Sequence, residues 1–140
     1  MLLRVSRKPK MINSRRKGAA GELEACAALA RIGLDCRRTV QYNGRAGLAD
    51  VVCEDAPKFH FEVKVTQRLN PYAFMDQAIR DMRKLPHVPI VVCKSNYRPW
   101  LLMIRLDDVP GFVEEYLNAR RLSTPAARQE VRCESTGPEA

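Results

Sequence analysis

Residues 58–66, with the sequence KFHFEVKVT, alternate between two kinds of side chain. The odd positions carry the large apolar residues Phe59, Phe61, Val63 and Val65, and the even positions carry His60, Glu62, Lys64 and Thr66. Because successive side chains of a strand point to opposite faces, this pattern predicts a strand with one face packed on a core. The rest of the chain must therefore supply a sheet around it and a layer to cover it.

The flanking segments alternate between helical and strand patterns. Helical spacing marks residues 15–32, where Gly33 follows, and also residues 71–85 and 107–121. Strand propensity marks residues 36–42, 48–53 and 100–106, and residues 88–94 are almost wholly apolar, as in a strand covered on both faces. This order, in a chain of 140 residues, predicts a single-domain α/β fold with a central mixed five-stranded sheet flanked by helices.

Positive charge is concentrated at the start of the chain. The protein has 24 Lys and Arg against 16 Asp and Glu, and residues 1–17 hold seven basic side chains and no acidic one. We therefore predict a basic arm (residues 1–14), a folded domain (15–121) and a polar tail (122–140). Such an arm indicates a polyanionic partner, of which nucleic acid is the common example. A solubilising tail, or an arm for targeting or for a membrane surface, is the alternative, although the arm lacks the periodic large apolar residues of a membrane-binding helix.

Several classes of protein are excluded. No apolar run is long enough to cross a bilayer, and the charged N-terminal segment lacks the apolar block of a signal peptide, so we expect a cytoplasmic protein with no membrane partner. Five cysteines without a CxxC pair indicate buried thiols rather than disulfides or zinc. The two histidines offer no metal site, and nothing indicates a small-molecule cofactor.

Two carboxylates and a lysine form a candidate hydrolytic site. Glu62 and Lys64 project from one face of the predicted strand, about 6.5 Å apart. Asp50 begins the preceding strand, and a hairpin over residues 51–61 would place it beside Glu62. Two adjacent carboxylates repel each other unless they share a cation, and oxygen ligands suit Mg²⁺ or Mn²⁺. Lys64 would bind a phosphate oxygen or position an attacking water.

The spacing of these residues resembles that of a known superfamily. Asp50, followed after eleven residues by Glu62-Val63-Lys64, resembles the PD-(D/E)xK nuclease signature, with Ala49 where the family often has proline. The strings RKGAAGELE, which contains Glu22, and EVKVT are similar to those of archaeal- and phage-type Holliday junction resolvases. The resemblance covers roughly residues 13–113 and implies the restriction-endonuclease-like fold.

The resemblance also implies a mechanism. Mg²⁺, with Mn²⁺ as substitute, would be held by Asp50, Glu62, the backbone carbonyl of Val63 and, directly or through water, Glu22. These three carboxylates and Lys64 would form the catalytic set. The enzyme would be a homodimer that resolves four-way DNA junctions by paired nicks during DNA recombination, in a bacterial, archaeal or phage-infected cell.

DNA contacts are expected from basic residues near the site, namely Arg15, Arg16, Lys17, Arg45 and Arg68. Some assignments remain open. Glu24 is the alternative to Glu22, Trp100 suits the core or a dimer contact, and Gln77 and His60 lie either near the site or elsewhere on their elements. Two other functions also remain open: another PD-(D/E)xK nuclease that nicks DNA or processes ends, and a catalytically silent DNA-binding module.

Overall fold

The computed structural model describes residues 14–39, 49–83 and 87–122. The predicted arm and tail lie outside these ranges, apart from Ser14 and Leu122. The predicted DNA-binding residue Arg45 also lies outside them. The elements are α1 (Ser14–Arg31), β1 (Cys36–Arg38), β2 (Val51–Cys53), β3 (Phe59–Val65), α2 (Pro71–Met82), β4 (Val88–Lys94), β5 (Leu101–Ile104), the 3₁₀-helix η1 (Leu106–Asp108) and α3 (Val109–Leu122).

The five strands form one sheet in the order β1-β2-β3-β4-β5. β3 and β4 are parallel and are joined through α2, whereas the other three strand pairs are antiparallel. The predicted mixed five-stranded sheet flanked by helices is therefore confirmed. No helix among the described residues has the length and apolar character needed to cross a membrane.

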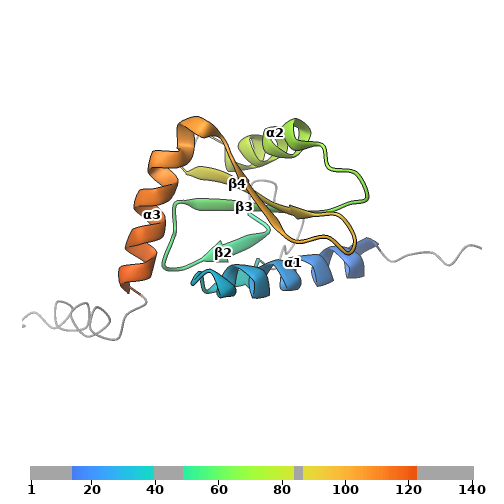
Figure 1. Cartoon of the computed structure of the whole chain (residues 1–140), viewed down its shortest axis with the longest axis horizontal. Helices are drawn as coiled ribbons and strands as arrows, with labels where there is room; N and C mark the ends of the chain where they lie inside the picture. The colour runs from blue at the N-terminus through green and yellow to red at the C-terminus, as the bar shows by residue number, and fades with distance from the viewer. Residues whose placement is uncertain (1–13, 40–48, 84–86, 123–140) are drawn as a thin grey trace, which may run out of the picture.

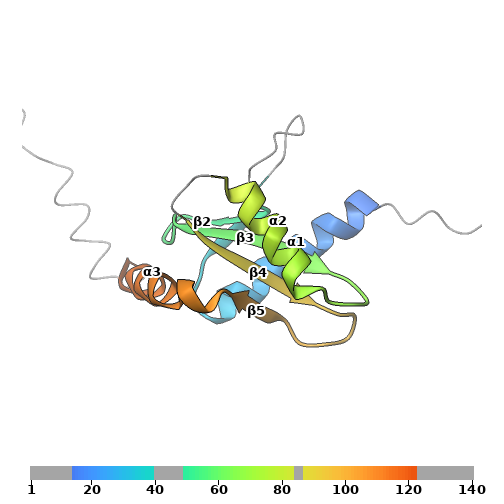
Figure 2. The ribbon, with the colours of Figure 1, turned by 90° about the horizontal axis from the view of Figure 1, so that it is seen from above.

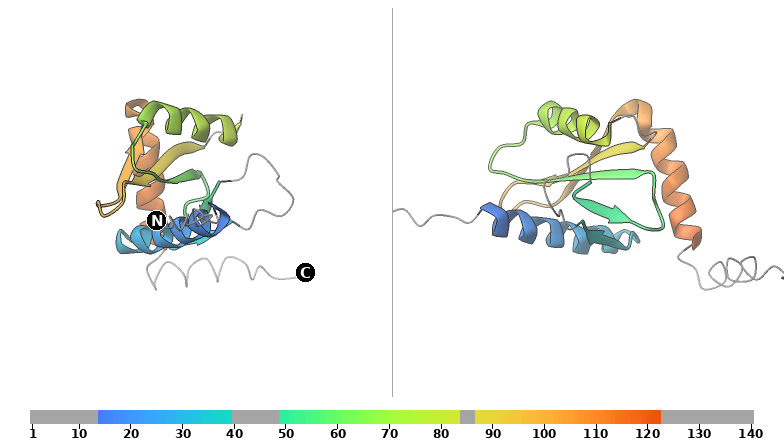
Figure 3. Two further views of the ribbon diagram at one scale, coloured as in Figure 1. Left: turned by 90° about the vertical axis from the view of Figure 1, so that its right-hand side faces the viewer. Right: turned by 180° about the vertical axis from the view of Figure 1, so that it is seen from behind.

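Helices cover both faces of the sheet, with α2 on one face and α1 on the other (Figure 1; Figure 3, right). Ala25 and Leu29 of α1 and Ala119 of α3 pack in the larger core, which includes Phe61. Met75 and Ala78 of α2 belong to a second, smaller core with Val91 and Cys93 of β4. Seen from above, α2 crosses over β3 and β4 (Figure 2).

Both faces of β3 are buried over most of its length, which the alternating pattern alone does not predict. Phe59 and Phe61 enter the larger core. His60 and Glu62, on the opposite face, are each only 3% exposed. Because Glu62 is level with Val91 and Lys64 with Cys93 across the parallel pair, the polar residues share a face with the core under α2. The candidate catalytic residues therefore lie between the sheet and α2.

Two glycines fix the course of α1. Gly21 is buried, and a Cβ at this position would lie 3.1 Å from Cγ2 of Val65, so the missing side chain lets α1 approach the end of β3. Gly33 has a φ of 87°, a conformation that glycine adopts without strain, and it ends the helix as predicted.

The predicted boundaries differ from the observed ones mainly at strand ends. β2 begins at Val51 instead of residue 48, because Asp50 lies in a bend. β5 ends at Ile104, and Leu106–Asp108, predicted to span a strand end and a helix start, form η1. α2 ends at Met82, three residues before the predicted end. Of the predicted strand over 36–42, Cys36–Arg38 is a strand and residues 40–42 are not described.

Candidate active site

Asp50 is held by both neighbouring strands. Its N–H donates to the carbonyl of Phe61 at 3.0 Å, and its carbonyl accepts from the N–H of Thr39 at 3.0 Å. Its side chain faces β3, where Oδ2 accepts a hydrogen bond from the N–H of Val63 at 2.9 Å. A carboxylate fixed at the backbone and at its oxygen is well positioned to serve as a ligand.

The backbone of Val63 belongs to the same site. β3 and β4 are parallel, and two hydrogen bonds show which residues of β3 face β4. The carbonyl of Lys58 accepts from the N–H of Val88, and the N–H of Thr66 donates to the carbonyl of Lys94. The backbone groups of the even-numbered residues of β3 therefore bond to β4. The N–H and C=O of a strand residue point to the same side of the strand. The carbonyl of Val63, like its N–H, therefore points toward the side of Asp50, where the resemblance predicts a metal ligand.

Glu62 and Lys64 are in direct contact. Nζ of Lys64 lies 2.9 Å from Oε1 of Glu62 and donates to Oε1 of Gln77 at 2.8 Å. Gln77, for which the sequence left two placements open, thus contacts Lys64 from α2. The lysine amino group is anchored on both sides, next to a carboxylate whose side chain is only 4% exposed.

The carboxylates disfavour each other's charge. Burial is the largest cause that raises the pKa of Asp50, and the charges of Glu22 and Asp81 raise it further, while the N–H of Val63 and the charge of Lys64 oppose the shift. Burial is also the largest cause that raises the pKa of Glu62, and the charge of Asp50 is the second. The contact with Lys64 lowers this pKa. A nearby cation would relieve this repulsion.

The donor set fits a hard divalent cation. In the described part of the chain, no three Asp, Glu, His or Cys side chains are grouped so as to hold a metal ion. The site instead offers two carboxylates, from Asp50 and Glu62, next to the inward-pointing carbonyl of Val63. Mg²⁺ is typically bound by one or two carboxylates together with water and substrate phosphates, so the carboxylates of Asp50 and Glu62 suit it.

Glu22 approaches this site from the other face of the sheet. Oε2 of Glu22 accepts an ion-paired hydrogen bond from Nε of Arg38 on β1, and its charge acts on Asp50. Glu22 therefore pairs with an arginine, and its negative charge raises the pKa of Asp50. The guanidinium of Arg38 supplies a positive charge at this edge of the site.

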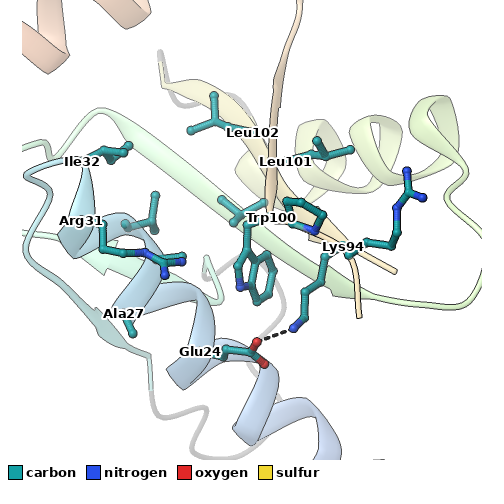
Figure 4. A pocket seen from close by; sticks show the side chains of 13 residues that line it. Glu24, Ala27, Arg31, Ile32, Lys94, Trp100, Leu101 and Leu102 are labelled. Atoms are coloured by element: carbon teal, nitrogen blue, oxygen red, sulfur yellow. Dashed lines mark hydrogen bonds and ion pairs between the residues drawn. The ribbon is translucent and has the colours of Figure 1, made fainter. Parts of the chain in front are cut away.

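Glu24, the alternative to Glu22, points elsewhere. Its carboxylate pairs with Nζ of Lys94, which lies 5.2 Å from the ring centre of Trp100 (Figure 4). These residues line a cavity of about 590 Å³ between α1 and the start of β5. Trp100 also packs against the larger core, which is the first of the two placements predicted for it.

A second cavity, of about 360 Å³, lies between α1 and the end of β3 and is lined by Glu22. Its lining comes from the first half of α1, with Lys17, Gly18, Gly21 and Glu22, and from the end of β3, with Val63, Lys64, Val65 and Thr66. The two glycines leave this groove open, and Lys17 supplies positive charge on its wall. A groove with a basic side chain on its wall can admit a phosphate group beside the end of β3.

The predicted DNA-binding residues are only partly described. Lys17 lines the groove, Arg16 is exposed on the same helix, and Arg68 is exposed in the segment after β3. The side chain of Arg15 lies outside the described part, as does Arg45. Arg16, Lys17 and Arg68 therefore flank the end of β3 that carries Lys64.

Two charged residues of the site were missed from the sequence. Arg38, counted there only among the basic residues, is the partner of Glu22. Asp81 lies on α2 one helical turn after Gln77, and its charge acts on Asp50, Glu62 and His60. The spacing of four residues from Gln77 was the available signal for Asp81, because such pairs share a helix face.

His60 lies beside this cluster, with its Nε2 buried and without a hydrogen-bond partner among the described residues.

Comparison with known proteins gives the family. Among solved structures, the chain is similar to Hjc, a Holliday junction resolvase from the archaeal hyperthermophile Archaeoglobus fulgidus, with 16% identity and a TM-score of 0.48 over 61% of this chain and 75% of that one. No curated protein matches the chain. Residues 13–136 match the family model described as "Phage putative PDDEXK endonuclease". The chain thus belongs to this family of PD-(D/E)xK endonucleases.

Proposed function

We propose that this protein is a metal-dependent endodeoxyribonuclease that resolves four-way DNA junctions as a homodimer. The observation that carries the proposal is the arrangement of Asp50, Glu62 and Lys64. The buried carboxylate of Glu62 and the half-buried one of Asp50 both lie at β3, and a lysine contacts Glu62. Membership in an endonuclease family supports hydrolysis of a phosphodiester. The preference for junctions rests on the resemblance of RKGAAGELE and EVKVT to the resolvase strings.

Each residue has a proposed role. Asp50, Glu62 and the carbonyl of Val63 would hold Mg²⁺ or Mn²⁺, and Glu22 would contribute through water. When bound, the ion would lower the pKa of a water molecule and offset the charge of the scissile phosphate. The carboxylate of Glu62 accepts from Lys64 and so orients its amino group. Lys64 then stabilises negative charge on the phosphate or holds the attacking water, and Gln77 keeps it in place.

The groove beside α1 provides the path for the DNA strand. Lys17 and Lys64 line it, and Arg16 and Arg68 lie exposed nearby. Such residues contact phosphates and do not read bases, so selectivity would come from the shape of the DNA. The basic arm (1–14), Arg15 and Arg45 would extend these contacts, and the tail (122–140) would lie beyond the nuclease domain. Two chains related by a two-fold axis would bring two such sites to opposed strands of one junction, which would account for paired nicks.

A competition experiment tests the substrate. The full chain is incubated with Mg²⁺ and equal amounts of a labelled four-way junction and a linear duplex of the same arm sequence. We expect cleavage of the junction in two opposed strands at a rate far above that of the duplex. Equal cleavage of both substrates would favour a general nicking or end-processing nuclease. Tight binding to DNA without cleavage in Mg²⁺ or Mn²⁺ would indicate a silent DNA-binding module.

A further inference from the structure

Three of the five cysteines meet on the side of the sheet opposite α2. Cys53 of β2 lies in the larger core, and Cys36 of β1 and Cys26 of α1 pack against it. All three are free thiols. None of them takes part in the proposed hydrolysis, so their grouping calls for a separate explanation.

Cys36 and Cys53 are directly opposite each other on adjacent antiparallel strands. Residues in this position have Cα atoms about 4.5–5.5 Å apart, which lies within the range of about 4.4–6.8 Å found for disulfides. Their Cβ atoms, at about 4.5–5.5 Å, are somewhat farther apart than the mean of about 3.8 Å in a disulfide. A bond between them therefore requires the two strands to close slightly. A strained bond of this kind is readily reduced again.

The two thiols interact. The Cys36 thiol hydrogen-bonds to the sulfur of Cys53, and this bond is the main cause that lowers the pKa of Cys53 to about 7. The same bond, with burial, raises the pKa of Cys36. The lowered pKa favours the thiolate of Cys53, which is the form that reacts with oxidants. Cys53 is only 3% exposed, so a small oxidant reaches it more easily than a large one.

We propose that Cys36 and Cys53 form a reversible, peroxide-sensitive dithiol that closes into a disulfide between β1 and β2. The thiolate of Cys53 attacks hydrogen peroxide, breaking the O–O bond and forming a sulfenic acid with release of hydroxide. The sulfur of Cys36 then attacks this sulfenic sulfur, the S–S bond forms and water leaves. Overall, two thiols are oxidised, one peroxide is reduced and two water molecules are produced.

The disulfide would connect two strands that position the nuclease site. Arg38, the partner of Glu22, lies two residues after Cys36 on β1. Asp50 lies directly before β2, and its carbonyl is bonded to Thr39. Oxidation would therefore fix the spacing of the strand ends that carry Arg38 and Asp50. The dithiol itself does not depend on the nuclease assignment.

Mass spectrometry of the full chain tests the proposal. The protein is treated with a small molar excess of hydrogen peroxide at pH 7.5, alkylated under denaturing conditions and digested without reductant. We expect a linked pair of peptides that contain Cys36 and Cys53, with a mass loss of two hydrogens, and its disappearance after dithiothreitol. Cys93→Ala, which removes a buried cysteine from β4, is the matched control and should form the same linked pair.

Single variants identify the order of the reaction. In Cys36→Ser, which changes the less buried partner, Cys53 should stop at the sulfenic acid and be trapped by dimedone. In Cys53→Ala, Cys36 should stay reduced. Unmodified Cys36 and Cys53 in the treated wild-type protein would overturn the proposal, as would a linkage through Cys26 instead. Because the wild-type chain gives the decisive result, a variant that fails to fold does not weaken the test.

Discussion

At the scale of single residues, the amino group of Lys64 is held by two contacts. Its amino group is bound by Glu62 at 2.9 Å and by Gln77 at 2.8 Å. If it stabilises charge that develops on the phosphate, Lys64→Met should lower the rate of DNA cleavage by roughly 100- to 1000-fold. DNA affinity should change only a few-fold, because the other proposed DNA-binding residues would still contact the phosphates.

Single-turnover cleavage and a binding titration separate these effects. Lys58→Met is the matched control, since Lys58 is an exposed lysine directly before the same strand. It should cut at the wild-type rate. If Lys64→Met cuts as fast as Lys58→Met, Lys64 has no part in the reaction.

The charge of Asp50 should destabilise the protein when no divalent cation is present. Burial and the neighbouring carboxylates raise the pKa of Asp50 in the folded state. A group of this kind contributes its full stability below its unfolded pKa and loses that contribution as the pH rises through its folded pKa. In EDTA at pH 7.5, we therefore expect Asp50→Asn to raise the melting temperature by roughly 2–4 °C.

The gain should disappear near pH 3.5, below the unperturbed aspartate pKa of about 3.9. Thermal unfolding followed by circular dichroism at the two pH values measures the difference. Asp76→Asn, at an exposed position of α2, is the control and should have little effect at either pH. A decrease in the melting temperature of Asp50→Asn at pH 7.5 would contradict the sign of the argument.

At the scale of elements, the contact between α1 and β3 brings Glu22 to the site. A Cβ at Gly21 would lie 3.1 Å from Val65, whereas one at Gly18 would meet nothing within 4 Å. Gly21→Val should therefore lower the free energy of unfolding by about 1–3 kcal/mol through overpacking. Gly18→Val, with the same change in helix propensity, should leave it unchanged or slightly higher.

Urea unfolding gives the free energy of unfolding of the two variants. Because both make the same change in helix propensity within α1, a difference between them reports on packing. Similar stabilities for Gly18→Val and Gly21→Val would show that α1 does not pack closely on β3 at this position. Cleavage by Gly21→Val should also decrease, since a displaced α1 moves Glu22 away from Asp50.

The sequence predicted some elements better than others, for physical reasons. The strands around Phe61 and Ile90 were predicted to within one residue, because local alternation and a continuous apolar run determine them. The burial of His60 could not be predicted, since it depends on α2 covering that face of the sheet. The pairing of Glu22 with Arg38 joins residues far apart in the chain, and no local pattern encodes it.

At the scale of the whole molecule, charge is expected to govern the affinity for DNA. Deleting residues 1–12 removes four basic residues, Arg4, Arg7, Lys8 and Lys10, and leaves Arg15, Arg16 and Lys17. Each lost phosphate contact reduces the slope of log affinity against log salt by about 0.9. If two to four of these charges contact DNA, the slope should decrease by roughly 2–4.

Fluorescence anisotropy at several salt concentrations gives this slope for both proteins. The melting temperature should change little, because the predicted domain begins after the deleted segment. Cleavage at saturating protein should persist, since the metal-binding candidates lie elsewhere. An unchanged slope would mean that the arm makes no contact with DNA, and residues such as Arg16 and Arg68 would then account for binding.

The metal dependence of cleavage by the intact carboxylate pair tests the central claim most directly. Labelled four-way junction is incubated with the wild-type protein, Glu62→Gln and the control Asp76→Asn, in Mg²⁺ and in EDTA. We expect the wild-type and control proteins to cut in Mg²⁺ and to stop in EDTA, and Glu62→Gln to lose at least about 100-fold in rate while it still binds DNA. Cleavage that continues in EDTA, or at an undiminished rate in Glu62→Gln, would contradict the assignment of Asp50 and Glu62 as the metal-binding centre.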